Sequence, residues 1–375
     1  PGSTLKPLVY GLALQQRLVT PASVLDDSPL ALAAGAGDGS LYRPRNYDEA
    51  FRGPVRVREA LAASLNVPAV RVATMLGPDA VFDGLVRAGL RPDRHAGWHG
   101  HALALGSADT TLLDLANAYR ALANGGRWSA PRWTVPAAMP AWAQGAPREL
   151  LPPAVAWQLA HMLSDPAARA ATFGLDSPLV TRGFAAVKTG TSKDLRDNWC
   201  VGFSERYTVA VWVGNAGGQP MHGVSGSEGA APVWRELMQA LHEGQPSRAP
   251  APPPGLVAQG GEWFLAGTEP RPRAQAQVDG ATPAAFGITS PREGALIVLD
   301  PDIPMAAQRL VFEGEPGRWL LGGRELGRGA RISWLPRPGR HVLEHHGPGG
   351  VQRVRFEVRA APLPRHPGAG SPGPG

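Results

Sequence analysis

Residues 184–192 read Phe-Ala-Ala-Val-Lys-Thr-Gly-Thr-Ser, and this stretch decides the fold. The apolar run at its start predicts a buried strand. The polar residues that end the run suit a ligand. Gly190 lets another backbone approach closely, Thr189 and Thr191 offer hydroxyl groups, and Lys188 offers a cation for a carboxylate. We therefore expect a strand whose end forms part of a binding site.

The runs that follow repeat the strand pattern. Short β-branched or aromatic-rich runs, separated by polar turns, predict three antiparallel strands at 184–191, 198–204 and 207–215. Cys200, the only cysteine, lies in the second run, so we expect a buried, inert thiol and no internal disulfide. Helical spacing of apolar residues predicts helices at 5–13, 56–66, 79–88, 112–124, 153–164 and 231–242. This order favours an α/β domain that ends near residue 244.

Lysine is scarce in this chain, which has three lysines and 34 arginines. Two of the three lysines lie in short motifs. Lys6 closes Ser3-Thr4-Leu5-Lys6, and Lys188 opens Lys-Thr-Gly-Thr. A guanidinium stays protonated, whereas a lysine amine can be tuned by burial and neighbours until it accepts a proton. Both lysines are therefore candidates for acid–base chemistry.

Ser3 lies at the start of the first predicted helix, one turn before Lys6 and on the same face. Serine is a poor nucleophile until a neighbouring base takes its proton. A helix N-terminus also directs N–H groups and the positive end of its dipole at a developing oxyanion. The alternative for this motif alone is an N-cap serine beside a lysine that faces solvent. Ser64-Leu65-Asn66 adds a hydroxyl and an amide at a helix-to-loop junction, although by itself this motif indicates an ordinary helix end.

In this order, the motifs S-x-x-K, S-x-N and K-T-G resemble the signature set of serine β-lactamases and penicillin-binding proteins. Residues 1–244 resemble the transpeptidase domain of a penicillin-binding protein. The stretches that begin at Ala104 and Asn198 resemble its bifunctional class A members. The resemblance implies the serine β-lactamase/D,D-peptidase transpeptidase fold, an α/β fold with an antiparallel sheet and helices. It also implies an N-terminally truncated domain, because further strands would precede the nucleophile in a longer polypeptide.

The resemblance gives each motif residue a role. Ser3 would be the acyl-enzyme nucleophile, and Lys6 would be its general base. Ser64 would relay a proton to the leaving amine with help from Lys188. The substrate-binding residues would be Asn66 on the peptide amide and Thr189, Gly190 and Thr191 around the terminal carboxylate. The backbone N–H groups of Ser3 and Thr191 would form the oxyanion hole.

The second half of the chain changes composition. Residues 245–283 are rich in Pro, Ala, Gly and Gln, which predicts a linker with one short strand at 263–265. Residues 284–360 predict a small all-β sandwich, with strands at 295–299, 309–313, 318–321, 340–345 and 351–358. This part resembles the C-terminal domain of penicillin-binding proteins of the 1C type. We expect a disordered tail at 361–375.

The resemblance implies a peptidoglycan D,D-transpeptidase that cross-links stem peptides, is acylated by β-lactam antibiotics and needs no cofactor or metal. It also implies a place at the periplasmic face of the bacterial inner membrane. The membrane anchor and a glycosyltransferase domain acting on a lipid-linked precursor would lie outside this chain. The β domain would contact other cell-wall synthesis proteins. The net charge of +6 comes from scattered arginines with no basic run among aromatics, which argues against nucleic acid as a partner.

Two alternative functions stay open. A β-lactamase or D,D-carboxypeptidase would use the same motifs for hydrolysis. A class A β-lactamase, however, needs a glutamate a few dozen residues after S-x-N, and only Glu149 lies between Asn66 and Lys188. A non-catalytic protein with this fold would have no need of the motif lysines. The histidines at 95, 99 and 101 fit no helix face, so we expect a surface loop there and no zinc site.

Overall fold

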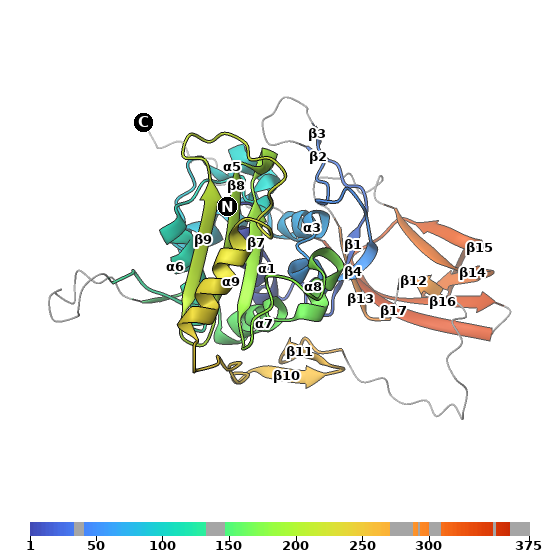
Figure 1. Ribbon diagram of the computed structural model, residues 1–375. Coiled ribbons are helices and arrows are strands. Elements are labelled where there is room, and N and C mark those ends of the chain that lie inside the picture. Colours follow the sequence, from blue (N-terminus) through green and yellow to red (C-terminus); the bar gives the residue numbers. More distant parts are fainter. Residues whose placement is uncertain are drawn as a thin grey trace, which may run out of the picture.

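The computed structural model describes residues 1–33, 41–132, 147–270, 288–291, 293–299, 309–347 and 350–360. The expected tail at 361–375 lies outside the described residues, as do residues 271–283 of the expected linker. Two parts are visible in Figure 1, a mixed unit of helices and strands up to residue 270 and an all-β unit after residue 287. None of the described helices is long and apolar enough to cross a membrane.

The described part of the first unit has more residues in helices than in strands. In chain order they are η1 (Gly2–Leu5), α1 (Lys6–Gln15), α2 (Val57–Ala62), α3 (Asn66–Leu76), α4 (Pro78–Arg87), α5 (Ala96–His99), η2 (Gly100–Leu105), α6 (Leu112–Ala123), α7 (Pro153–Leu163), α8 (Pro166–Phe173), η5 (Lys193–Leu195) and α9 (Ala230–Leu241), where η marks a 3-10 helix. The predicted helices at 79–88, 112–124, 153–164 and 231–242 lie within one residue of α4, α6, α7 and α9.

The strands of the first unit form one central sheet and several two-stranded ribbons. The sheet pairs β7 (Ala186–Thr191), β8 (Asp197–Phe203) and β9 (Thr208–Gly214) in the antiparallel order β7-β8-β9, which confirms the predicted meander. The ribbons pair β1 (Val24–Asp27) with β4 (Gly53–Arg56), β2 (Leu32–Ala33) with β3 (Leu41–Tyr42), β5 (Arg127–Trp128) with β6 (Arg148–Glu149), and β10 (Leu256–Gln259) with β11 (Glu262–Leu265).

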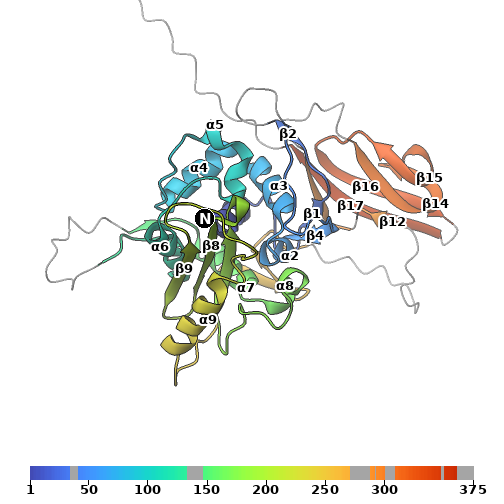
Figure 2. The ribbon, with the colours of Figure 1, turned by 45° about the horizontal axis from the view of Figure 1, so that its top comes forward.

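The central sheet lies between two apolar layers. One face, with Ala186 and Trp199, packs into the large cluster formed by α1 and the helices around it. The other face, with Val187 and Cys200, packs against Trp234 of α9, which lies across the sheet in Figures 1 and 2. Cys200 is fully buried, as expected. Because side chains alternate along a strand, Lys188 lies on the same face as Ala186, toward the helices.

The predicted single helix at 56–66 is wrong. The helix α2 ends at Ala62, and a new helix, α3, begins at Asn66. Ser64 between them has a left-handed backbone with φ of 63°, which turns the chain between the two helices. Pro68 does not stop a helix but lies in the first turn of α3, where the missing N–H costs no intrahelical hydrogen bond.

The second unit is all-β, as predicted. Its strands are β12 (Ile288–Ser290), β13 (Ala295–Leu299), β14 (Leu310–Leu321), β15 (Arg324–Trp334), β16 (Gly339–Gly347) and β17 (Gly350–Ala360). They form one six-stranded sheet in the order β12-β14-β16-β17-β13, with β15 on β14. The expected strands at 309–313 and 318–321 are halves of β14, whose register shifts between Glu313 and Gly317. Buried side chains from five of the strands gather around Phe312 and Trp319.

The β unit lies beside the β1–β4 ribbon in both overall views (Figures 1 and 2). Arg359 of β17 donates a hydrogen bond at 2.8 Å to the backbone carbonyl of Arg17, just after α1. The expected linker is more structured than predicted, because residues 256–265 form the β10–β11 hairpin. The hairpin lies against α7 at the edge of the first unit (Figure 1).

Candidate active site

The 3-10 helix η1 and helix α1 position the first motif. Ser3 lies in η1 and is partly exposed, whereas Lys6 begins α1 and is 0% exposed. Pro7 follows in the first turn of α1. The alternative in which Lys6 faces solvent is therefore wrong, because its amine is enclosed by protein.

The two motif lysines converge on Ser64. Lys6 Nζ donates to the carbonyl oxygen of Ser64 at 2.6 Å and lies 3.4 Å from its hydroxyl oxygen. Lys188 Nζ donates to the same hydroxyl at 2.7 Å and to the carbonyl of Thr189 at 3.0 Å. The left-handed backbone at Ser64 presents both oxygens to the two amines, a strain that is typical of functional sites.

Burial changes the protonation of both lysines. It lowers the pKa of Lys6 well below the ordinary value, and the positive charge of Lys188 lowers it further. Burial also lowers the pKa of Lys188, to about 7. Losing a proton relieves the cost of burying an ammonium group. Lys188 can therefore accept and return a proton near neutral pH, and the Lys6 amine gives up its proton more readily than a free lysine does.

Asn66 is held by a network that the sequence did not predict. Its side-chain oxygen accepts from Lys6 Nζ at 2.7 Å, and its backbone N–H donates to the side-chain oxygen of Asn46 at 2.8 Å. The Asn46 amide in turn donates to both carboxylate oxygens of Asp27, at 2.9 and 2.8 Å. Asp27 and Asn46 are both buried. They fix the start of α3, and with it the Ser64–Asn66 loop.

The glycine of the third motif permits a close contact with the first. A Cβ added to Gly190 would lie 2.2 Å from the carbonyl oxygen of Pro1, so β7 and η1 touch backbone to backbone. A Cβ on Gly2 would lie 2.4 Å from Thr191 O and 2.9 Å from Thr191 N, and one on Gly106 would meet the backbone of Gly2. Gly2 and Gly190 therefore allow η1 to lie against the end of β7, and Gly106 allows the residue after η2 to lie against Gly2.

Six of the predicted site residues line one pocket of about 220 Å³, namely Ser3, Ser64, Asn66, Thr189, Gly190 and Thr191. Lys6 and Lys188 are not part of the pocket lining, but each donates a hydrogen bond to Ser64. The hydroxyl oxygen of Thr191 accepts from Gly226 N at 3.0 Å, which ties β7 to the segment before α9. The structure thus brings all eight residues together.

Other residues of this pocket were missed by the sequence analysis. One wall is the C-terminal end of α8, with Ala171, Thr172 and Phe173. Further lining comes from Ala63 and Leu65 and from the side chains of Asn46, Tyr47, Asp48, Arg52, Ser225 and Ser227. Asp165-Pro166, an N-cap residue followed by proline at the first helical position, is a sequence signal that could have found α8.

The expected surface loop with three histidines is partly buried. His99 is 5% exposed, lies in α5, and contacts Ser107 Oγ at 3.1 Å and Asp93 Oδ1 at 3.5 Å. In the described parts of the chain, His, Cys, Asp and Glu form no group of three that could hold a metal ion.

Both units match known protein families. The penicillin-binding protein transpeptidase domain matches residues 1–239, and the Penicillin-Binding Protein C-terminus Family matches residues 275–356. Penicillin-binding protein 1C of Escherichia coli is 31% identical over 335 residues, which cover 83% of this chain and 41% of that protein. The chain thus spans about two fifths of the length of this curated relative.

Solved structures give the same result for the fold. Penicillin-binding protein 1A from Haemophilus influenzae superposes with a TM-score of 0.61 at 25% identity, over 72% of this chain and 48% of that one. The PonA1 protein of Mycobacterium tuberculosis, solved in complex with penicillin V, superposes with a TM-score of 0.55 at 24% identity, over 72% of this chain and 75% of that one.

Proposed function

This chain belongs to the penicillin-binding protein transpeptidase family, and from that premise we propose that it cross-links peptidoglycan stem peptides as a serine D,D-transpeptidase. The observation that carries the proposal is the convergence of two buried lysine amines on Ser64, beside a pocket that Ser3 lines. Burial lowers the pKa of both amines, so the site holds bases beside the pocket, and a serine that lines the pocket needs such a base to act as a nucleophile.

The proposed reaction has two acyl transfers. Ser3 Oγ attacks the carbonyl carbon of the donor peptide bond while Lys6 takes the hydroxyl proton. The C–N bond then breaks, and Ser64 passes a proton to the leaving amine with Lys188 as its neighbour. An acceptor amine next attacks the Ser3 ester, loses its proton to the same groups and releases Ser3 as a free hydroxyl. A β-lactam ring would be opened by the first transfer alone.

The rest of the pocket suits a peptide with a terminal carboxylate. Thr189 and Thr191 supply hydroxyls at the end of β7, and Asn66 lines the same pocket. The backbone N–H groups of Ser3 and Thr191 are proposed as the oxyanion hole. The contact between η1 and β7 at Gly2 and Gly190 supports this, because it sets the two backbones side by side.

The pocket supports acyl transfer over drug hydrolysis. Glu149, the only glutamate between the second and third motifs, lies exposed in β6 and does not belong to the pocket lining. Hydrolysis by the class A mechanism needs a glutamate at the acyl-enzyme. The proposal is therefore a transpeptidase that penicillin acylates and inhibits.

The resemblance to bifunctional relatives extends the proposal beyond this chain. We propose an intact protein with a membrane anchor and a glycosyltransferase domain that uses a lipid-linked precursor at the periplasmic face of the inner membrane. The β unit is proposed as a contact surface for other cell-wall synthesis proteins. We also propose a catalytic unit that runs to residue 265 and not 244, because the β10–β11 hairpin packs on α7.

A product analysis tests the activity. The intact protein is incubated with glycan strands that carry pentapeptide stems, and the products are separated and identified by mass spectrometry. Cross-linked dimers that disappear in Ser3→Ala would support the proposal. Shortened monomers alone would indicate a D,D-carboxypeptidase, and unchanged stems would indicate a non-catalytic protein.

A further inference from the structure

The β10–β11 hairpin, residues 256–265, lies outside both family matches, which end at residue 239 and resume at 275. Its turn consists of Gly260 and Gly261, whose φ angles of 60° and 78° suit a two-residue hairpin turn of type I′. Glu262 follows the turn directly and pairs with Gln259. The turn therefore presents Glu262 in a fixed position at the tip of the hairpin.

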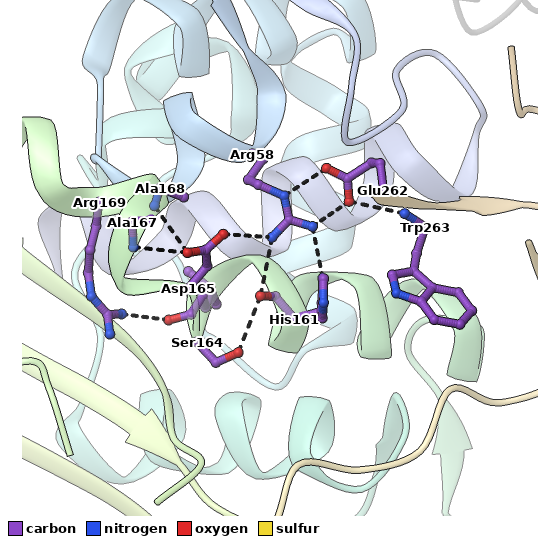
Figure 3. A network of polar contacts seen from close by, with 10 residues as sticks. Arg58, His161, Ser164, Asp165, Ala167, Ala168, Arg169, Glu262 and Trp263 are labelled. Carbon is purple, nitrogen blue, oxygen red and sulfur yellow. Dashed lines mark hydrogen bonds and ion pairs between the residues drawn. The ribbon is translucent and has the colours of Figure 1, made fainter. Parts of the chain in front are cut away.

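Glu262 forms a two-point ion pair with Arg58 of α2, 204 positions earlier in the chain (Figure 3). Arg58 Nε donates to Glu262 Oε2 at 2.7 Å, and Arg58 Nη2 donates to the other carboxylate oxygen. Both side chains are only 11% exposed. A bidentate pair in such a buried position fixes geometry far better than a single surface contact.

Arg58 also binds α7 and α8. Its Nη1 lies 3.3 Å from Asp165 Oδ2, and its Nη2 lies 2.8 Å from His161 Nδ1 (Figure 3). Burial lowers the pKa of His161, which favours the neutral ring that can accept this hydrogen bond. Asp165 is itself the N-cap of α8, because its other oxygen accepts from Ala167 N and Ala168 N.

The hairpin is also packed by aromatic rings. The Trp157 ring of α7 stacks on the His161 ring, with a distance of 4.8 Å between the ring centroids. It also meets the Trp263 ring edge-on, with a centroid distance of 5.2 Å. Gln158 Nε2 donates to the Trp263 carbonyl at 2.8 Å. The hairpin is therefore fixed to α7 independently of the ion pair, and it can serve as a rigid support for the Arg58 side chain.

Arg58 lies six residues before Ser64, and α2 is a short helix of six residues. The backbone N–H of Ser64 donates to the Leu61 carbonyl, so the position of Ser64 follows that of α2. The second element that Arg58 holds, α8, carries Ala171 and Phe173, which line the same pocket as Ser64. One guanidinium thus links α2, which leads to Ser64, with the α8 residues that line the pocket.

We propose that Glu262 and Arg58 are positioning residues for the active site, through which the β10–β11 hairpin sets the position of Ser64 and of the α8 residues that line the pocket. Neither side chain lines the pocket, so neither is a catalytic residue. The inference rests on the proposed function only for its readout, which is acylation by penicillin. Because Ser64 supplies two oxygen acceptors to the lysine amines, a displaced Ser64 changes proton transfer as well as geometry.

The test compares Glu262→Gln with wild type in the intact protein. The first-order rate constant for acylation by a fluorescent penicillin is measured at saturating drug across pH and normalised to folded protein. We expect a loss of about tenfold or more, because small misplacements of catalytic groups carry losses up to about a hundredfold. We also expect the acidic limb of the profile to move to lower pH, because ammonium groups that lose acceptors release their protons more readily.

Glu269→Gln is the matched control. Glu269 lies in the same segment and accepts from Gly267 N at 2.6 Å, but its contact is local and away from Arg58. This control should keep the wild-type rate and pH midpoint. If Glu262→Gln does not fold, Glu262→Asp decides, since it keeps the charge with a shorter reach. It should show a smaller rate loss and a midpoint shift in the same direction.

The outcomes separate this inference from the proposed function. A melting temperature that falls while the folded fraction keeps the wild-type rate and midpoint would show a merely structural ion pair and overturn the inference. A wild-type protein that penicillin does not acylate would overturn the proposed function instead. A lowered rate with a shifted midpoint, in Glu262→Gln but not in Glu269→Gln, is the predicted result.

Discussion

Lys188 Nζ donates a hydrogen bond of 2.7 Å to the hydroxyl of Ser64, although the two residues are 124 positions apart. The same Ser64 also accepts from Lys6 through its backbone carbonyl. Two amines on one residue cannot both be charged without strong repulsion in a buried site. The site therefore holds fewer protons than its lysines would bind in water, and this deficit can be measured.

The first prediction concerns stability against pH. Burial lowers the pKa of Lys188 to about 7, and that of Lys6 also falls, whereas an unfolded lysine has a pKa of about 10.4. Between these pH values the unfolded chain binds more protons than the folded chain, so the free energy of unfolding rises with pH from about 7 to about 10.4. Below about pH 7 the contribution of Lys188 no longer changes with pH. Each lysine contributes a slope of up to about 1.4 kcal/mol per pH unit.

Urea unfolding at several pH values tests this prediction. Lys188→Met and Lys6→Met should each remove part of the slope. Lys193→Met is a matched control, because Lys193 is the remaining lysine and is exposed. An unchanged slope in both buried variants would show that the amines keep ordinary protonation in the folded protein.

The second prediction concerns Lys6 as a base. Replacing Lys6 with Arg keeps a positive charge but removes the capacity to accept a proton. Acylation by penicillin should fall by about 10² to 10⁴, the usual contribution of general acid–base catalysis. Stopped-flow labelling gives the rate, and circular dichroism checks the fold. Labelling at the wild-type rate would rule out Lys6 as the base.

The third prediction concerns the contact between β7 and η1. Gly190→Ala places a methyl group about 2.2 Å from the Pro1 carbonyl oxygen, so the two backbones must separate. We expect a loss of about 1 to 3 kcal/mol in the free energy of unfolding and nearly complete loss of acylation. In Gly97→Ala, the control, the new methyl meets only the His95 ring at 3.4 Å, and both quantities should stay near wild type.

The fourth prediction concerns the support behind Asn66. In Asn46→Ala, the backbone N–H of Asn66 and the buried carboxylate of Asp27 each lose the hydrogen-bond partner that the Asn46 side chain provides. Stability should fall by about 1 to 3 kcal/mol, and acylation should slow because Asn66 and Ser64 shift together. Asn215→Ala, which removes an exposed amide, is the control. Equal effects of the two variants would contradict a role for Asn46 in the site.

Much of this architecture follows from local sequence. The strand β7 and the helices α6 and α9 were predictable because their apolar periodicity is uninterrupted and their ends carry turn residues. The break between α2 and α3 was not, because a serine in a left-handed conformation looks like any helical serine. β15 was missed because its Gly327 and Gly329 and its arginines hide the strand pattern, and pairing with β14 stabilises it instead.

The residues of the site also fall into two groups, those that the sequence predicts and those that only the fold reveals. The motif residues could be found because their chemistry is encoded in short spacings. Asp27, Asn46, Arg58 and Glu262 could not, because each acts through a partner that only the fold brings near, and neither residue type nor spacing marks them. Supporting residues of this kind need the three-dimensional structure.

The site of acylation tests most directly whether Ser3 is the nucleophile. The intact protein is treated with penicillin, digested and mapped by mass spectrometry, with Ser3→Ala in parallel. We predict one covalent adduct per chain on the peptide that contains Ser3, and none in Ser3→Ala. An adduct on any other residue, or one that survives in Ser3→Ala, would contradict the assignment of Ser3 as the nucleophile.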